Sequence, residues 1–108
     1  SMKLTIGQII SMWNTVEKLY QMNESFPLMW DVKMGHNFKV FAPVVKALQD
    51  KTVDERKEII DKEIELPLTK VRLDEMPQTV PPGTVGVLAP MIEDYKQEKV
   101  NINVEELL

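Results

Sequence analysis

The chain opens with a helical pattern of apolar and polar positions. Thr5 and Gln8 have the spacing of a capping box, in which each side chain bonds the other residue's exposed backbone N–H. Leu4, before the cap, and Ile9 can pack together as a hydrophobic staple. We therefore predict a helix from Thr5 to about Gln21. Its apolar side covers about half of the circumference and consists of Ile6, Ile9, Ile10, Met12, Trp13, Val16, Leu19 and Tyr20.

So wide an apolar side predicts contact with more than one neighbouring element. Two interpretations stay open: the whole side lies in the core of the protein, or part of it forms a homodimer surface. Gly7 lies in the first turn of this helix, where it could let another segment approach closely or could be incidental.

A second helical seam follows the break at residues 23–27, NESFP. It consists of Trp30, Met34, Phe38, Phe41, Val45 and Leu48, at spacings of three or four residues. Pro43 lies within the seam's range but faces away from it, and a proline inside a free helix costs about 3 kcal/mol. We predict one long helix that is kinked at Pro43, with a break into two helices at Ala42 as the alternative.

The remaining pattern is mixed. Thr52 and Glu55 form a second capping box, which predicts a charged helix over residues 53–62. The period then changes to two, which predicts a strand over residues 64–73 and another over residues 100–104; the two can pair. A short helix, capped by Thr84 and ended by Pro90, lies between them. The predicted class is α+β: two or three N-terminal helices, a long helical hairpin among them, packed with a small C-terminal antiparallel sheet.

The length of the chain indicates a single domain. The 108 residues suit one domain, with a helical part over about 5–62 and a part with strands, loops and a short helix over 63–108; Ser1 is interpreted as a tag remnant. The net charge of −4 argues against a nucleic-acid partner. No apolar stretch nears the ~20 residues of a membrane span, and no signal peptide pattern is present.

Candidate catalytic residues are few. The chain has no cysteine and one histidine, His36, which the helical wheel puts on the polar side of the second helix. Asp54, Glu58 and Asp61 share a helix face, but lysines and an arginine interleave with them, which favours a solvated surface. The PPGTVG stretch at residues 81–86 lacks a P-loop lysine. We expect a protein that is not an enzyme and holds no cofactor or metal.

A protein-binding surface is the better candidate. Phe26, Leu28, Met29 and Trp30 surround the predicted break, and aromatic residues and methionine are enriched at the centres of interfaces. The alternative is that these four residues close one end of the helical core. Four methionines are not accounted for by the apolar stripes and could also make contacts: Met22, Met29, Met76 and Met91.

The chain also resembles a family of small proteins encoded by phages and prophages of Gram-positive bacteria. The similarity rests on the KLTIGQ opening at residues 3–8, the Phe26-Pro27 break before a long helix, and a late Leu-x-Pro motif at Leu88 and Pro90. The resemblance implies a phage origin and a location in the host cytoplasm. It carries over no catalytic residue, because the family has no assigned activity.

The resulting functional hypothesis is a non-enzymatic phage accessory protein. It would act by binding another protein, of the host or of the phage, and could be a homodimer. The alternative is a role in virion morphogenesis, in the assembly or completion of the head or tail.

Overall fold

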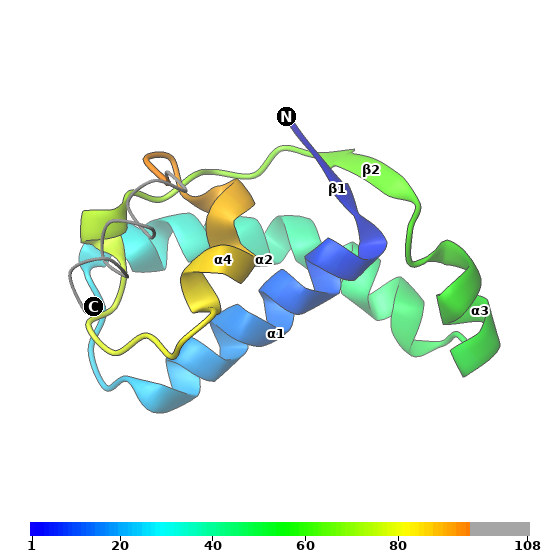
Figure 1. Cartoon of the computed structure of the whole chain (residues 1–108), viewed down its shortest axis with the longest axis horizontal. Coiled ribbons are helices and arrows are strands. Elements are labelled where there is room, and N and C mark those ends of the chain that lie inside the picture. Colours follow the sequence, from blue (N-terminus) through cyan, green and yellow to red (C-terminus); the bar gives the residue numbers. More distant parts are fainter. Residues whose placement is uncertain (96–108) are drawn as a thin grey trace, which may run out of the picture.

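The computed structural model describes residues 1–95 as a helical hairpin with a two-stranded antiparallel sheet and a short helix packed on it (Figure 1). This arrangement confirms the predicted α+β class. The helices are α1 (Ile6–Met22), α2 (Leu28–Gln49), α3 (Val53–Ile59) and α4 (Thr84–Leu88), the strands are β1 (Met2–Thr5) and β2 (Glu63–Leu66), and the 3₁₀ helices are η1 (Leu73–Glu75) and η2 (Ala89–Met91).

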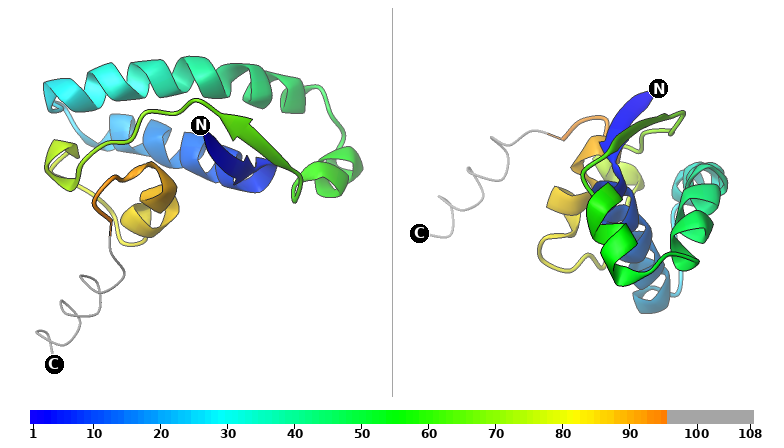
Figure 2. Two further views of the ribbon diagram at one scale, coloured as in Figure 1. Left: turned by 90° about the horizontal axis from the view of Figure 1, so that it is seen from above. Right: turned by 90° about the vertical axis from the view of Figure 1, so that its right-hand side faces the viewer.

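Helix α1 lies at the centre of the fold. It contacts α2, α4 and β1, as its wide apolar side predicts. Figure 2 shows α2 and α4 on different sides of α1. The residues of α1 that are buried in this way are Ile6, Ile9, Met12, Val16 and Leu19. All of these except Ile6 pack with Trp30, Met34 and Phe41 of α2 and with Leu88 of α4 in one hydrophobic core.

Helix α2 runs without a break through Pro43, so the alternative of a break into two helices at Ala42 is wrong. Pro43 is exposed, as predicted, while the seam residues Trp30, Phe41 and Leu48 are buried. The proline leaves the carbonyl of Lys39 without its helical partner, and on an exposed helix side water can bond that oxygen. Burial of the seam therefore holds the helix together across the proline. The kink stays a prediction.

Both capping boxes are confirmed. Thr5 Oγ1 accepts a bond from the Gln8 backbone N at 3.0 Å, and Gln8 Oε1 accepts one from the Thr5 N at 2.9 Å. Thr52 and Glu55 make the same pair of bonds at the start of α3, at 3.2 and 3.0 Å. The bonds from the Thr52 backbone and side chain lower the pKa of the Glu55 carboxyl.

The start of α1 also shows that Gly7 lets another segment approach closely. The backbone N of Gly7 donates to the Ile60 carbonyl at 2.9 Å, and the N of Ile6 donates to the Lys62 carbonyl at the same distance. These bonds satisfy two of the N–H groups that every helix leaves free in its first turn. A Cβ at Gly7 would lie 3.0 Å from Ile60 Cγ1, so the missing side chain is what lets the chain after α3 come so close.

The sheet differs from the prediction in its pairing. β2 pairs antiparallel with β1, with Met2 opposite Leu66 and Thr5 opposite Glu63. β1 was not predicted, because four residues before a helix cap carry too little pattern to identify a strand. The predicted partner strand at residues 100–104 lies outside the described residues. Between β2 and residue 95 the chain forms no further strand, and within that range Val71 makes an isolated parallel bridge to Ile92.

Residues 67–80, which we call the strap, return across the hairpin to α4 (Figure 1). Two asparagines hold it by imitating a backbone partner. Asn37 donates from Nδ2 to the Thr69 carbonyl at 2.9 Å and accepts the Thr69 N–H at Oδ1 at 2.8 Å. Asn23 makes the same two bonds to Thr79, at 3.0 and 3.2 Å. Each amide thus stands where a neighbouring strand would otherwise pair.

Lys33 and His36 of α2 also bind the strap. Lys33 Nζ lies 2.7 Å from Glu75 Oε1 in a largely buried ion pair. This bond is the main reason why the pKa of the Glu75 carboxyl is lowered. His36 Nε2 donates to the Pro67 carbonyl at 2.8 Å.

Helix α4 begins one residue earlier than a Thr84 cap would place it. The N-cap is Gly83, with φ at 86°, a left-handed conformation that glycine adopts without steric cost. Thr84 is itself the first helical residue and is buried. The PPGTVG stretch is therefore a turn into a short helix.

Candidate protein-binding surface

Exposed apolar side chains gather at the turn of the hairpin, between the end of α1 and the first turns of α2. Leu28 is 76% exposed, Val32 56%, Met22 45% and Met29 43%. Among residues 1–95 only three other large apolar side chains are exposed, and they lie on other elements. We call these four residues of the hairpin turn the turn patch.

Aromatic side chains that neighbour the turn patch in the sequence pack against one another. The rings of Tyr20 and Phe26 lie 4.4 Å apart, and Tyr20 is also close to Trp30, at 6.5 Å between ring centres. Trp30 is fully buried, and its Nε1 makes no hydrogen bond within the described residues. The turn patch therefore lies on a packed aromatic layer rather than on a loose loop.

A hydrogen bond fastens the two helices at this end. The Tyr20 hydroxyl donates to Asp31 Oδ1 at 2.8 Å, which joins the last turn of α1 to the first turn of α2. Partial burial raises the pKa of the Tyr20 hydroxyl, and the bond to Asp31 and its charge raise it further. The hydroxyl therefore stays protonated and keeps donating well above neutral pH.

The four candidate residues from the sequence have different positions. Leu28 and Met29 are exposed and belong to the turn patch, whereas Phe26 is only partly exposed. Trp30 packs in the core and offers no surface, so for Trp30 the alternative of closing the helical core holds. Its place in the helical seam already indicated this position.

The four candidate methionines also divide into exposed and buried ones, and one residue of the turn patch was not identified from the sequence. Met22 and Met29 are exposed, while Met76 and Met91 are buried. Val32 was not a candidate. Its position four residues after Leu28, on the side of α2 opposite the seam, was the available signal.

A shallow aromatic cleft lies on the outer side of the hairpin, next to the turn patch. Trp13, Tyr20 and Phe38 line it together with Glu17 and Gln21, and its volume is about 460 Å³. Trp13 meets Phe38 edge to face, with ring centres 4.7 Å apart. These rings are only half-buried, so this part of the apolar side of α1 is open at the surface. A homodimer through this surface stays a prediction.

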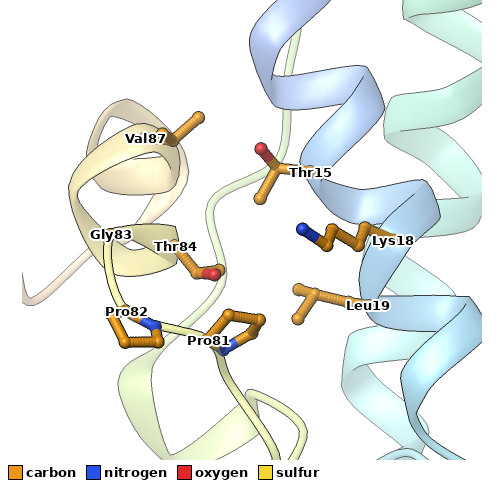
Figure 3. Close-up of a pocket in the computed structure, with 8 residues that line it drawn as sticks. All are labelled: Thr15, Lys18, Leu19, Pro81, Pro82, Gly83, Thr84 and Val87. Atoms are coloured by element: carbon orange, nitrogen blue, oxygen red, sulfur yellow. The ribbon is translucent and has the colours of Figure 1, made fainter.

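A second concave surface lies between α1 and α4. Thr15, Lys18 and Leu19 of α1 face Pro81, Pro82 and the start of α4 across a pocket of about 200 Å³ (Figure 3). The Lys18 side chain extends from α1 toward α4. This pocket has no histidine, carboxylate or thiol that could act on a substrate.

Groups with catalytic potential are scattered. His36 is used to hold the strap, and Glu55 caps α3. Within the part of the chain that is described, no group of histidine and carboxylate residues is arranged to hold a metal ion. Among the same residues, no helix has the length and apolar character needed to cross a membrane.

Comparisons of the chain with protein-family models, with curated proteins and with solved structures found no match.

Proposed function

We propose that this chain is a non-enzymatic accessory protein, of phage origin, that acts by binding another protein through the turn patch. The observation that carries this proposal is the clustering of exposed apolar side chains. Four of the seven large apolar residues exposed within residues 1–95 lie in one short stretch, from Met22 to Val32. Exposed apolar groups that gather in one place are typical of interaction sites.

Energetics indicate how large the binding surface must be. Full burial of a leucine, valine or methionine side chain contributes about 1.5–3 kcal/mol. The four side chains of the turn patch are roughly half exposed, so their burial would contribute about 3–6 kcal/mol. Association costs about 4–15 kcal/mol in lost freedom of movement. The turn patch alone is therefore too small for a stable complex.

The aromatic cleft supplies the additional surface. Tyr20 connects the two sites, since it lines the cleft and its ring packs against that of Phe26 in the hairpin turn. Tryptophan, tyrosine and phenylalanine are all enriched at protein interfaces, and tryptophan and tyrosine are also enriched among the residues that contribute most of the binding energy. We infer that the partner covers the turn patch and the cleft together, along the outer side of the hairpin.

The test is a capture experiment with tagged protein in lysates of infected and uninfected Gram-positive host cells, followed by mass spectrometry. Leu28→Glu should abolish recovery of the partner, because a charge at the centre of the turn patch must be desolvated on binding. Val53→Glu is the matched control, since Val53 is similarly exposed but lies on α3. Both variants should keep the melting temperature of the unchanged protein.

The outcomes separate the hypotheses. A protein recovered by the unchanged chain and by Val53→Glu, but not by Leu28→Glu, would support the proposal. Equal recovery by both variants would contradict the role of the turn patch. If only phage structural proteins are recovered, and only after infection, the partner is a virion component and the morphogenesis alternative is favoured.

A further inference from the structure

The aromatic cleft has rings from both long helices and a carboxylate between them. Trp13 and Tyr20 come from α1 and Phe38 from α2. Among the described residues that line the cleft, Glu17 is the only charged one. On α1, Glu17 follows Trp13 by four residues and precedes Tyr20 by three, so both rings neighbour it on the same side of the helix. The cleft therefore combines aromatic walls with a negative charge.

The rings of the cleft are held at different angles. The ring planes of Trp13 and Phe38 differ by 83°, and those of Tyr20 and Phe38 differ by 44°. The Tyr20 hydroxyl donates to Asp31, and the Tyr20 ring packs against Phe26, so Tyr20 is held from two sides. Rings set at such angles border a ligand on more than one side. Aromatic cages that bind cations have this construction, because the face of each ring attracts positive charge.

Glu17 lacks a cationic partner. Its side chain is exposed, and none of the salt bridges within residues 1–95 includes it. Covering an ionised carboxylate with an apolar surface costs free energy unless a cation pairs with it. A protein that covers the aromatic cleft must therefore bring a positive charge to Glu17. The net charge of −4 also favours a basic surface on the partner.

We propose that the aromatic cleft receives an arginine side chain of the partner protein. Its guanidinium lies against the ring of Trp13 and donates to the Glu17 carboxylate. Arginine fits better than lysine, because a guanidinium is flat, stacks on aromatic rings and presents paired N–H donors to a carboxylate. Arginine is also enriched at interfaces, where lysine is depleted. This inference rests on the proposed function, since the cleft is part of the surface that the partner covers.

The first test uses small probes instead of the partner. The probes are N-acetylarginine methylamide and the corresponding citrulline compound, which has the same shape without the charge. In an NMR titration of the full chain labelled with nitrogen-15, the indole N–H signal of Trp13 should shift saturably with the arginine probe. The signal of the buried Trp30 should not shift. The citrulline probe should bind about tenfold more weakly, because it makes neither the cation–π contact nor the ion pair.

A substitution tests the role of the carboxylate. Glu17→Gln keeps the size of the side chain and removes its charge, so it should weaken binding of the arginine probe about threefold. Glu58→Gln is the matched control, since Glu58 is an exposed glutamate on α3. Both variants should keep the melting temperature of the unchanged protein.

Four results of the titration would overturn the proposal. They are the absence of a saturable shift at Trp13, equal affinities for the arginine and citrulline probes, equal effects of the two variants, and binding of N-acetyllysine methylamide as tight as that of the arginine probe.

The capture experiment separates this inference from the proposed function. Glu17→Gln should lower recovery of the captured protein several-fold, whereas Glu58→Gln should not. If Leu28→Glu abolishes recovery but Glu17→Gln leaves it unchanged, the arginine contact is wrong and the proposed function stands. If the arginine probe binds beside Trp13 but Leu28→Glu does not reduce recovery, the arginine site is supported and the role of the turn patch is wrong.

Discussion

Replacing Asn37 tests whether the strap is held by side-chain amides. In Asn37→Ala the Thr69 N–H and carbonyl lose both partners, which lie at 2.8 and 2.9 Å in the unchanged protein. Each lost hydrogen bond costs about 1 kcal/mol, and leaving a group unpaired near the core adds about 1 kcal/mol or more. Asn37 is buried, so water cannot readily replace it. We expect the free energy of unfolding to fall by about 2–4 kcal/mol.

Asn23→Ala is the matched control, because Asn23 makes the same two bonds to Thr79 but at a partly exposed position. Water can take over those bonds, so we expect a loss of about 1 kcal/mol. The assay is urea unfolding followed by tryptophan fluorescence, with Trp30 reporting from the core. An unchanged dependence on urea would show that each variant changes stability and not the unfolding mechanism.

Asn37→Asp sharpens the test, since it keeps the shape of the side chain but replaces the donating amide with a carboxyl group that is charged when ionised. A buried carboxylate facing the Thr69 carbonyl is unfavourable, so folding raises the pKa of this new carboxyl. A raised pKa means that the folded state binds the proton more tightly, so the destabilisation relative to Asn37 should shrink as the pH falls from 7 toward 4. The reasoning is refuted if Asn37→Ala costs no more than Asn23→Ala, or if Asn37→Asp shows no such pH dependence.

Two further predictions concern glycine and charge. Gly35→Ala, on an open part of α2, should raise the free energy of unfolding by about 0.5–1 kcal/mol. Gly7→Ala should give no such gain, because its Cβ would lie 3.0 Å from a neighbouring side chain. Equal gains for the two variants in urea unfolding would contradict this prediction. The bond to Lys33 lowers the pKa of Glu75 below its ordinary value of 4.5, so Glu75 stabilises the fold above that pH and the stabilisation is lost as the pH falls through the lowered pKa. The melting-temperature difference between the unchanged protein and Glu75→Gln should therefore shrink below about pH 4.5, and a difference that stays constant from pH 7 to 3 would refute it.

The helices could be predicted because their signals are local. The Thr5–Gln8 and Thr52–Glu55 boxes each lie within four residues and fix where α1 and α3 begin. The seam of α2 repeats often enough to identify the helix even with Pro43 inside it. Packing of the buried face keeps α2 helical through Pro43, since the proline lies on the exposed side.

The pairing of the sheet and the docking of the strap could not be predicted, because the paired residues are far apart in the sequence. Met2 pairs with Leu66, and Asn23 bonds Thr79, 56 residues away. An asparagine that imitates a strand leaves no periodic pattern. The expected pairing of residues 64–73 with residues 100–104 rested on alternation alone, and alternation does not specify which strand is the neighbour.

The candidate surface was only partly predictable. Composition identified the right turn, but it could not tell which of the apolar residues there face outward. The wheel of α2 resolves this, since Trp30 lies in the seam while Leu28 and Val32 lie on the opposite side.

The two asparagine contacts with the strap bear on the order in which the protein folds. The hairpin of α1 and α2 closes through a short turn, and such local contacts form early because little chain entropy is lost. The bonds from Asn37 to Thr69 and from Asn23 to Thr79 require loops of 32 and 56 residues to close first. The strap should therefore dock after the hairpin has formed. The side-chain amides of Asn37 and Asn23 are then already in place on the hairpin to donate and accept the bonds to the strap. In hydrogen exchange, the Thr69 and Thr79 amides should become protected later during refolding than those in the middle of α1.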